Sequence, residues 1–239
     1  MADYSTQELM IIAAAREIHD RELVFVGMRL PITAYGVARL THSPDAVGLF
    51  EGGVARYAPA EGTLYTMCDP ANQLGAAWTT GLVQVMGMLQ RGIVDAGFIG
   101  GAEIDRFGNI NTSYIGGHEP GKMKVKLPGS GGAADIAALA KRLIAIMNHE
   151  KHRLVERVGY VTSTGRNNAA VITDRCVLRP YGPERELHVV SVHPGHSFDE
   201  VRENTGWDVK PAPDMSETQA PTAQEIDALR RIDQDGFWR

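Results

Sequence analysis

The stretch Leu23-Val24-Phe25-Val26 decides the fold, because it is an unbroken apolar run that ends at Gly27. Apolar residues without alternation are typical of a strand buried on both faces, as in a parallel sheet. Pro31 suits the first turn of a helix, and we expect that helix to reach about Leu40. A second strand is expected over residues 46–50. This order of strand, helix and strand predicts an α/β unit with parallel strands.

Helices and short apolar runs alternate along the rest of the chain. Ser5-Thr6-Gln7-Glu8 has the spacing of a capping box and predicts a helix that reaches about His19. Lys210 to Pro221 holds three prolines and few apolar residues, so we interpret it as a surface crossing. The remaining expected elements are a helix over 82–90, strands over 94–99, 143–147 and 187–192, and helices that begin at capping boxes 197–200 and 222–225.

These elements predict an α/β fold with an open, mainly parallel sheet flanked by helices on both faces. The sequence contains no internal repeat, coiled-coil heptad or low-complexity tract. The stretch after Pro221 is too short to form a core of its own. We therefore expect residues 1–239 to form a single domain.

Composition and charge exclude several classes of function. Hydrophobic residues make up 44% and charged residues 22% of the 239 residues, which is typical of a globular protein. The 24 basic and 29 acidic residues give a net charge of −5, and this balance argues against nucleic-acid binding. No apolar run reaches the ~18–20 residues that span a bilayer. Residues 1–5 lack the pattern of a secretory signal, so a soluble cytoplasmic protein is expected.

The cysteines and histidines do not have the spacing of a metal site. Cys68 and Cys176 are too few for a disulfide framework, and we interpret them as small buried hydrophobic residues. In the polar stretch 149–153 the two histidines are three residues apart, whereas the helical zinc motif requires four. A polar surface stretch or a subunit contact is favoured over metal binding there. No metal is expected.

Glu51 is the first candidate for chemistry, because it follows a predicted strand and precedes Gly52 and Gly53. Reactive groups gather at the carboxyl ends of strands in open parallel sheets. The two glycines allow another molecule to approach the backbone closely. The carboxylate could therefore act as a base, a nucleophile or a charge partner. An ordinary surface glutamate in a tight turn is the competing interpretation.

The second candidate is the loop Gly129-Ser130-Gly131-Gly132, which opens a predicted helix. Backbone N–H groups of such a loop can bind a phosphate or a developing oxyanion. The loop lacks both the phosphate-loop ending and the dinucleotide fingerprint, and a plain strand-to-helix turn remains open. The acidic stretch 100–105 lies near another strand end, but the turn residues after it favour a structural role equally. No serine–histidine–acid order is identifiable.

Taken together, these segments resemble a known family. The chain is similar to the β subunit of family I CoA-transferases, and most closely to the glutaconate CoA-transferase β-subunit type. The similarity covers almost the whole length in matching order. It is carried by Leu30-Pro31, Ser43-Pro44-Asp45, Glu51 with Gly53, 98–105, 108–111, 129–133, 149–151, 160–163 and 203–206.

The resemblance implies an open α/β fold of the NagB/RpiA-like kind and an obligate, homologous α subunit with the active site at the interface. It implies that Glu51 attacks an acyl-CoA thioester and later carries CoA as a glutamyl-CoA thioester. It gives Ser130, Gly131 and Gly132 the task of binding the oxyanion or CoA, beside Gly52 and Gly53. Coenzyme A is then a cosubstrate, and no permanently bound cofactor is expected.

Two departures from the family keep an alternative open. Gly52 stands where the glutaconate type has serine, and Arg56 to Ala71 does not align clearly. The stretches 192–195 and 221–232 also resemble relatives that open a steroid-derived ring, and other relatives decarboxylate a CoA thioester. A CoA-thioester hydrolase or lyase, or a non-catalytic partner subunit, is therefore the alternative. Glu51 favours transfer, because those relatives tend to lack the glutamate.

Overall fold

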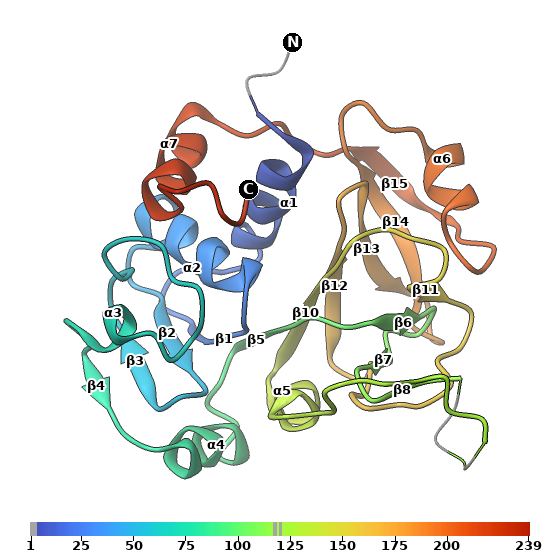
Figure 1. Ribbon diagram of the computed structural model, residues 1–239. Coiled ribbons are helices and arrows are strands. Elements are labelled where there is room, and N and C mark those ends of the chain that lie inside the picture. Colours follow the sequence, from blue (N-terminus) through green and yellow to red (C-terminus); the bar gives the residue numbers. More distant parts are fainter. Residues whose placement is uncertain (1–3, 117–118, 120) are drawn as a thin grey trace.

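A ten-stranded sheet runs through the protein, as the computed structural model shows for residues 4–116, 119 and 121–239 (Figure 1). Residues 1–3, which belong to the N-terminal stretch where no secretory signal was expected, lie outside the described residues. In spatial order the strands are β15 (Pro211–Glu217), β14 (Glu186–Val192), β13 (Cys176–Tyr181), β12 (Asn168–Ile172), β10 (Arg142–Ile146), β5 (Ala96–Ile99), β1 (Leu23–Val26), β2 (Val47–Phe50), β3 (Val54–Arg56) and β4 (Trp78–Thr79).

The centre of this sheet is parallel. Strands β12, β10, β5, β1 and β2 pair with one another in parallel, and antiparallel hairpins extend both sides. Parallel strands end at the same edge, so the loops after β1, β2, β5 and β10 share one side of the molecule. The predicted open, mainly parallel α/β fold is confirmed. Smaller sheets are formed by β11 (Leu154–Val155), β6 (Glu103–Asp105) and β7 (Ile110–Asn111), and by β8 (Tyr114–Ile115) and β9 (Val125–Lys126).

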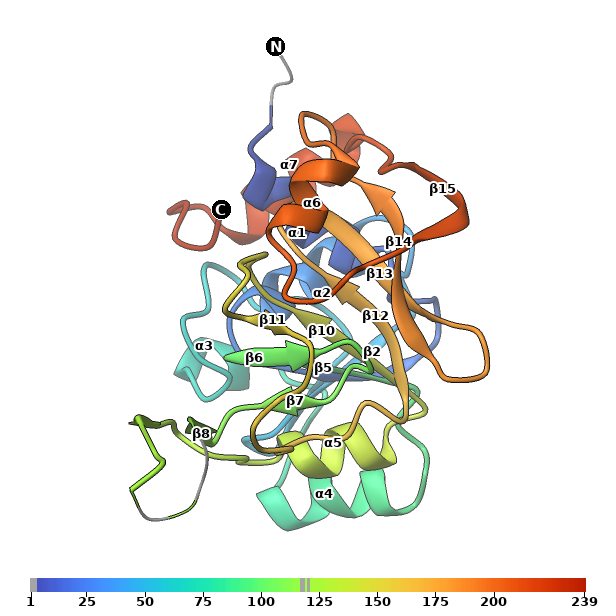
Figure 2. The same ribbon diagram turned by 90° about the vertical axis from the view of Figure 1, so that its right-hand side faces the viewer.

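Both faces of the main sheet are covered (Figure 2). Val24 and Val26 of β1 pack with one core cluster, together with helices α1, α2 and α7. Phe25, which points to the other face, packs with α4 and α5. This alternation is what a strand buried on both faces requires. The helices are α1 (Thr6–Ala15), α2 (Leu30–Leu40), α3 (Pro70–Gln73), α4 (Leu82–Gln90), α5 (Ala133–Leu139), α6 (Phe198–Glu203) and α7 (Ala223–Ile232).

The helix termini follow the predicted caps with two corrections. Ser5 and Thr222 each form a complete capping box, as expected. Ser197 accepts from the Glu200 amide, but the Glu200 carboxylate pairs with Arg175 and His196, so this box is only half formed. Helix α1 ends at Ala15, four residues before the predicted end, because the chain tightens there into i+3 hydrogen bonds.

The interpretation of Lys210 to Pro221 as a surface crossing was wrong. Pro211–Glu217 forms β15, which pairs in parallel with β14 at one edge of the main sheet. Proline lacks the backbone donor of an inner strand, and an edge strand tolerates it because one side needs no partner. Within the described residues, no helix combines the length and apolar composition that crossing a bilayer requires.

Candidate active site

The turn after β2 presents Glu51 at the carboxyl edge of the sheet. The Gly53 amide donates to the Phe50 carbonyl at 2.9 Å and closes this turn. Gly53 has a φ of +94°, and a Cβ there would lie 2.1 Å from the Thr80 carbonyl oxygen. Only glycine fits this position, so Gly53 shapes the turn that displays the carboxylate.

Gly52 lies under a cysteine. A Cβ on Gly52 would lie 2.7 Å from Sγ of Cys68, so the thiol packs directly against the backbone beside Glu51. Cys68 is exposed, which corrects its interpretation as a buried hydrophobic residue. It belongs to the surface segment between β3 and α3, where no element covers it. Cys176, by contrast, is buried as predicted, and burial raises the pKa of its thiol to about 12.

The glycine loop meets Glu51 directly. The Gly132 amide donates a hydrogen bond of 3.2 Å to Oε1 of Glu51. A Cβ on Gly132 would lie 3.0 Å from the same oxygen and 2.4 Å from Cε of Met86, so glycine permits the contact. Gly131 has a φ of +50°, and its amide has no protein acceptor among the described residues. Oγ of Ser130 accepts from the Ala134 amide, in the first turn of α5, at 3.1 Å.

A cavity of about 490 Å³ contains both features. Its floor is apolar, and the glycine loop forms one wall while the turn at Glu51 forms another. The lining residues are Phe25, Gly27, Met28, Arg29, Glu51, Met67, Phe98–Ala102, Thr112 and Leu127–Ala133 with Ile136. An apolar cleft with few polar groups at the carboxyl edge of parallel strands is typical of a small-molecule site. The two candidates from sequence thus line one cavity.

Sequence reasoning missed the loop after β1. Gly27, Met28 and Arg29 line the cavity, and Arg29 has the unusual backbone angles φ +73° and ψ −126°. A Cβ on Gly27 would lie 2.3 Å from the Phe98 carbonyl oxygen, so β1 and β5 approach closely here. The rule applied to Glu51, that side chains after a buried parallel strand face the site, applies equally to Arg29 and would have found it.

The other polar candidates lie outside this cavity. Glu103 accepts from the Asn111 side chain at 2.7 Å, and Asp105 accepts from the amides of Phe107 and Asn109 at 3.0 Å each. These contacts show the structural role that the sequence left open. The glycines Gly100 and Gly101 of the same stretch do line the cavity.

The two histidines of the polar stretch diverge. His149 is buried and contacts Oγ1 of Thr173 and Oγ1 of Thr205 at 3.1 and 3.0 Å, and burial lowers its pKa to about 4. His152 lies at the surface and pairs with Glu150 at 3.1 Å. Within the described part of the chain, no three histidine, cysteine or acidic side chains gather in a way that could hold a metal ion.

Comparison with known proteins places the chain in a family. The family model for coenzyme A transferase matches residues 7–204. The chain is 37% identical to the β subunit of the 3-oxoadipate CoA-transferase of Pseudomonas knackmussii, over 98% of this chain and 95% of that protein. It is 30% identical to the β subunit of the glutaconate CoA-transferase of Acidaminococcus fermentans, over 96% of this chain and 94% of that protein.

Solved structures agree with this assignment. The crystal structure of the Acidaminococcus fermentans glutaconate CoA-transferase superposes with a TM-score of 0.88 at 26% identity, over 99% of this chain and 98% of that chain. The decarboxylase AibA/AibB superposes with a TM-score of 0.89 at 29% identity, over the same shares. The sequence relatives with the higher identities are transferase subunits, so the alternative of a hydrolase or lyase is not favoured. The chain belongs to the coenzyme A transferase family, as a subunit of the β type.

Proposed function

We propose that Glu51 is the nucleophile of this CoA-transferase subunit and that the glycine loop stabilises charge during the transfer. The observation that carries the proposal is the hydrogen bond from Gly132 to Oε1 of Glu51 at the wall of the cavity. This contact holds the carboxylate beside the glycine loop. The Gly131 amide of that loop has no protein acceptor among the described residues, and a Cβ on Gly131 would lie 3.9 Å from Oε1 of Glu51. Nucleophile and donors therefore face the same space.

The chemistry balances without a metal, a redox step or a permanently bound cofactor. An oxygen of Glu51 attacks the thioester carbon, and the C–S bond breaks. CoA leaves as a thiolate, and an acyl-glutamyl anhydride remains on the enzyme. The thiolate attacks the Glu51 carbonyl, which releases the first carboxylate and leaves a glutamyl-CoA thioester. The acceptor carboxylate then attacks that carbonyl, the C–S bond breaks, CoA leaves as a thiolate, and a second acyl-glutamyl anhydride forms. The thiolate attacks the acyl carbon of the acceptor in this anhydride, which forms the new acyl-CoA and releases the Glu51 carboxylate.

The amides of Gly131 and Gly132 support the step in which the thioester oxygen gains charge. In the absence of substrate the Gly132 amide binds Glu51, and during attack the two amides together can donate to the new oxyanion. One well-placed donor of this kind contributes about 3–4 kcal/mol of transition-state stabilisation. Ser130 has a different task, because its hydroxyl accepts from the Ala134 amide and so joins the loop to the first turn of α5.

The proposed substrates are short dicarboxylic acids and their CoA thioesters. The two sequence relatives described above are named for 3-oxoadipate and glutaconate, which are both dicarboxylates. The cavity volume of about 490 Å³ fits a small acyl group together with the end of the pantetheine arm.

The proposed partner is a homologous α subunit that covers the cavity. Large apolar side chains are exposed on the segment from α3 to α4, at one side of the main sheet (Figure 1). They are Leu74, Trp78, Leu82 and Val83, and Val83 is 78% exposed. An exposed apolar patch beside an open site is typical of a permanent interface. The continuous sheet supports the further proposal that residues 1–239 act as one domain.

Trapping the covalent intermediate tests the proposal. The complex with its partner subunit is incubated with an acyl-CoA in the absence of acceptor, digested and analysed by mass spectrometry. We expect CoA attached through a thioester to the peptide that contains Glu51, and no adduct in a Glu51→Ala complex. Turnover without any adduct, or an adduct that persists in the variant, would exclude Glu51 as the nucleophile. A hydrolase or lyase would consume the acyl-CoA without transferring CoA to an added carboxylate.

A further inference from the structure

The backbone of Arg29 has a conformation that residues other than glycine rarely adopt. Its φ of +73° and ψ of −126° place it outside the regions that L-residues favour. Arg29 occupies the last position before α2, directly after the close approach of Gly27 to β5. Glycine would adopt these angles without strain, so arginine is the less stable choice here. Strained residues that persist are concentrated at functional sites.

Arg29 lies at the junction of two cavities. It lines the cavity of about 490 Å³ that contains Glu51, and it lines an adjoining cavity of about 550 Å³. Met28, Gly100 and Gly101 are the other residues that the two cavities share. The two cavities therefore meet at the ends of β1 and β5, where Glu51 lines one of them and Arg29 lines both.

The guanidinium of Arg29 has no carboxylate partner within the described residues. It faces the Trp238 ring, whose centroid lies 5.7 Å from Cζ. Arg153, which lines the second cavity, instead pairs with Glu150 at 3.0 Å. Exposed Arg29 thus keeps the planar array of donors that matches a carboxylate in two parallel hydrogen bonds.

We propose that Arg29 is a specificity-determining residue that binds the second carboxylate of a dicarboxylate substrate while the reacting carboxyl group faces Glu51. This rests on the function proposed above. Phe25, Phe98 and Ile99 line the same cavity, and their apolar surface accommodates the methylene chain. The phosphates of CoA are the other anions in the reaction, but the whole pantetheine arm separates them from the thioester. Because Arg29 lines the same cavity as Glu51, we expect it to bind the acyl chain and not a phosphate of CoA.

The test compares two acceptors of equal chain length, one dicarboxylate and one monocarboxylate, with the same acyl-CoA donor and the intact complex. In Arg29→Gly we expect the ratio of kcat/KM for the dicarboxylate to that for the monocarboxylate to fall by about 10- to 100-fold. Most of the change should appear in KM. Arg29→Lys should restore part of the ratio. The melting temperature of Arg29→Gly should equal or exceed that of the wild type, because glycine relieves the strained backbone.

Arg21→Gly is the matched control. Arg21 also has a positive φ, of 63°, but it lies before β1 and lines neither cavity. We expect this variant to retain the wild-type ratio. A wild-type enzyme that transfers CoA to monocarboxylates with no preference for dicarboxylates would overturn this inference and leave the role of Glu51 intact. Equal losses of kcat/KM for both acceptors in Arg29→Gly would overturn it as well. If, in addition, the variant kept wild-type kcat/KM with pantetheine thioesters that lack the CoA phosphates, Arg29 would bind a CoA phosphate instead. Absence of the glutamyl adduct would instead contradict the proposed function.

Discussion

The amide of Gly132 donates a hydrogen bond of 3.2 Å to Oε1 of Glu51, although 81 residues separate the two in sequence. The sheet makes this contact possible, because Glu51 follows β2 and Gly132 precedes α5, which packs beneath β5 and β10. The nucleophile proposed here and its loop therefore depend on one another for position.

Replacement of Glu51 should abolish transfer. In Glu51→Ala we expect kcat to fall by about 1,000-fold or more, because only positioning and oxyanion stabilisation remain. Glu61→Ala is the control, since Glu61 is an exposed glutamate of a nearby loop, and it should keep wild-type kcat. The measurement is CoA transfer in the reconstituted complex, with circular dichroism to verify folding. More than about a tenth of the wild-type kcat in Glu51→Ala would contradict the covalent role.

A methyl group on Gly132 should impair catalysis with little effect on folding. Its Cβ would crowd Oε1 of Glu51 and the flexible end of Met86, and the backbone of Gly132 accepts alanine with a φ of −79°. We expect kcat of Gly132→Ala to fall by about 100-fold. Gly87→Ala, in open space inside α4, should retain activity and gain about 0.5–1 kcal/mol in unfolding free energy. Similar kcat values for the two variants would show that the loop is only a turn.

The two cysteines should differ in reactivity. Cys68 is exposed, whereas Cys176 is fully buried with a pKa raised to about 12 by burial. A thiol reagent should therefore modify one cysteine per native chain and both after denaturation. Quantitative labelling followed by peptide mapping checks this. Cys68→Ala should eliminate the native reaction, and labelling of Cys176 in the native chain would contradict the buried position of β13.

Two buried histidines should make the protein less stable in mild acid. Burial lowers the pKa values of His149 and His193 from 6.5 to about 4. Below pH 6.5 the unfolded chain binds protons that the native chain does not, so stability is lost as the pH falls toward 4. Each histidine should contribute up to ~1.4 kcal/mol per pH unit, and neither contributes a slope above 6.5. Urea unfolding across this range measures the slope, which should decrease in His193→Gln. An unchanged slope in that variant would show that His193 is protonated in the native state.

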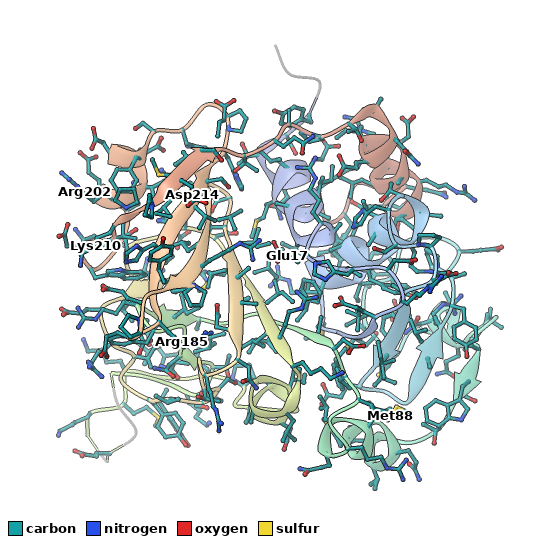
Figure 3. The ribbon with its side chains drawn as sticks, turned by 180° about the vertical axis from the view of Figure 1, so that it is seen from behind. Glu17, Met88, Arg185, Arg202, Lys210 and Asp214 are labelled. Carbon is teal, nitrogen blue, oxygen red and sulfur yellow. The ribbon has the colours of Figure 1, made fainter. Side chains whose placement is uncertain are left out.

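Charge on the exposed apolar patch should prevent assembly. We expect Val83→Asp to abolish co-purification with the α subunit and to leave the isolated chain folded, because Val83 is largely exposed. Tyr181→Asp is the control, since Tyr181 is also exposed. Tyr181 ends β13, next to the turn that holds Arg185. In Figure 3, Arg185 lies on the opposite side of the molecule from Met88 of α4, the helix that carries Val83. Size-exclusion chromatography with light scattering provides the measurement. Intact complexes of Val83→Asp would place the interface elsewhere.

Much of the fold could be predicted because its inner strands are simple apolar runs. The strand over 23–26 has the predicted bounds, and the one expected over 94–99 begins two residues later at Ala96. β15 was missed because proline at position 211 argues against a strand unless that strand is known to lie at the edge of a sheet. Edge position is a property of the whole sheet, and a local pattern does not contain it.

The residues of the candidate site could be predicted from the sequence, but the contact between them could not. Glu51 and the glycine loop were visible from the residues that flank them, but their hydrogen bond depends on strand order. The position of Arg29 after a buried parallel strand does indicate the site, whereas its positive φ has no sequence signal, because such angles usually occur at glycine or asparagine. Cys68 was misjudged because composition ranks cysteine as a buried residue, whereas the position beside Gly52 is open to solvent.

The edge strand β15 also limits how this protein can polymerise. Pro211 and Pro213 lack the amide hydrogen that an added strand would need, and the opposite edge, β4, is only two residues long. Main-chain pairing with a neighbouring molecule is therefore disfavoured at both edges, which opposes the fusion of sheets into continuous ribbons. Association through side-chain surfaces is favoured instead, and contacts of that kind form closed complexes of fixed size more readily than fibres.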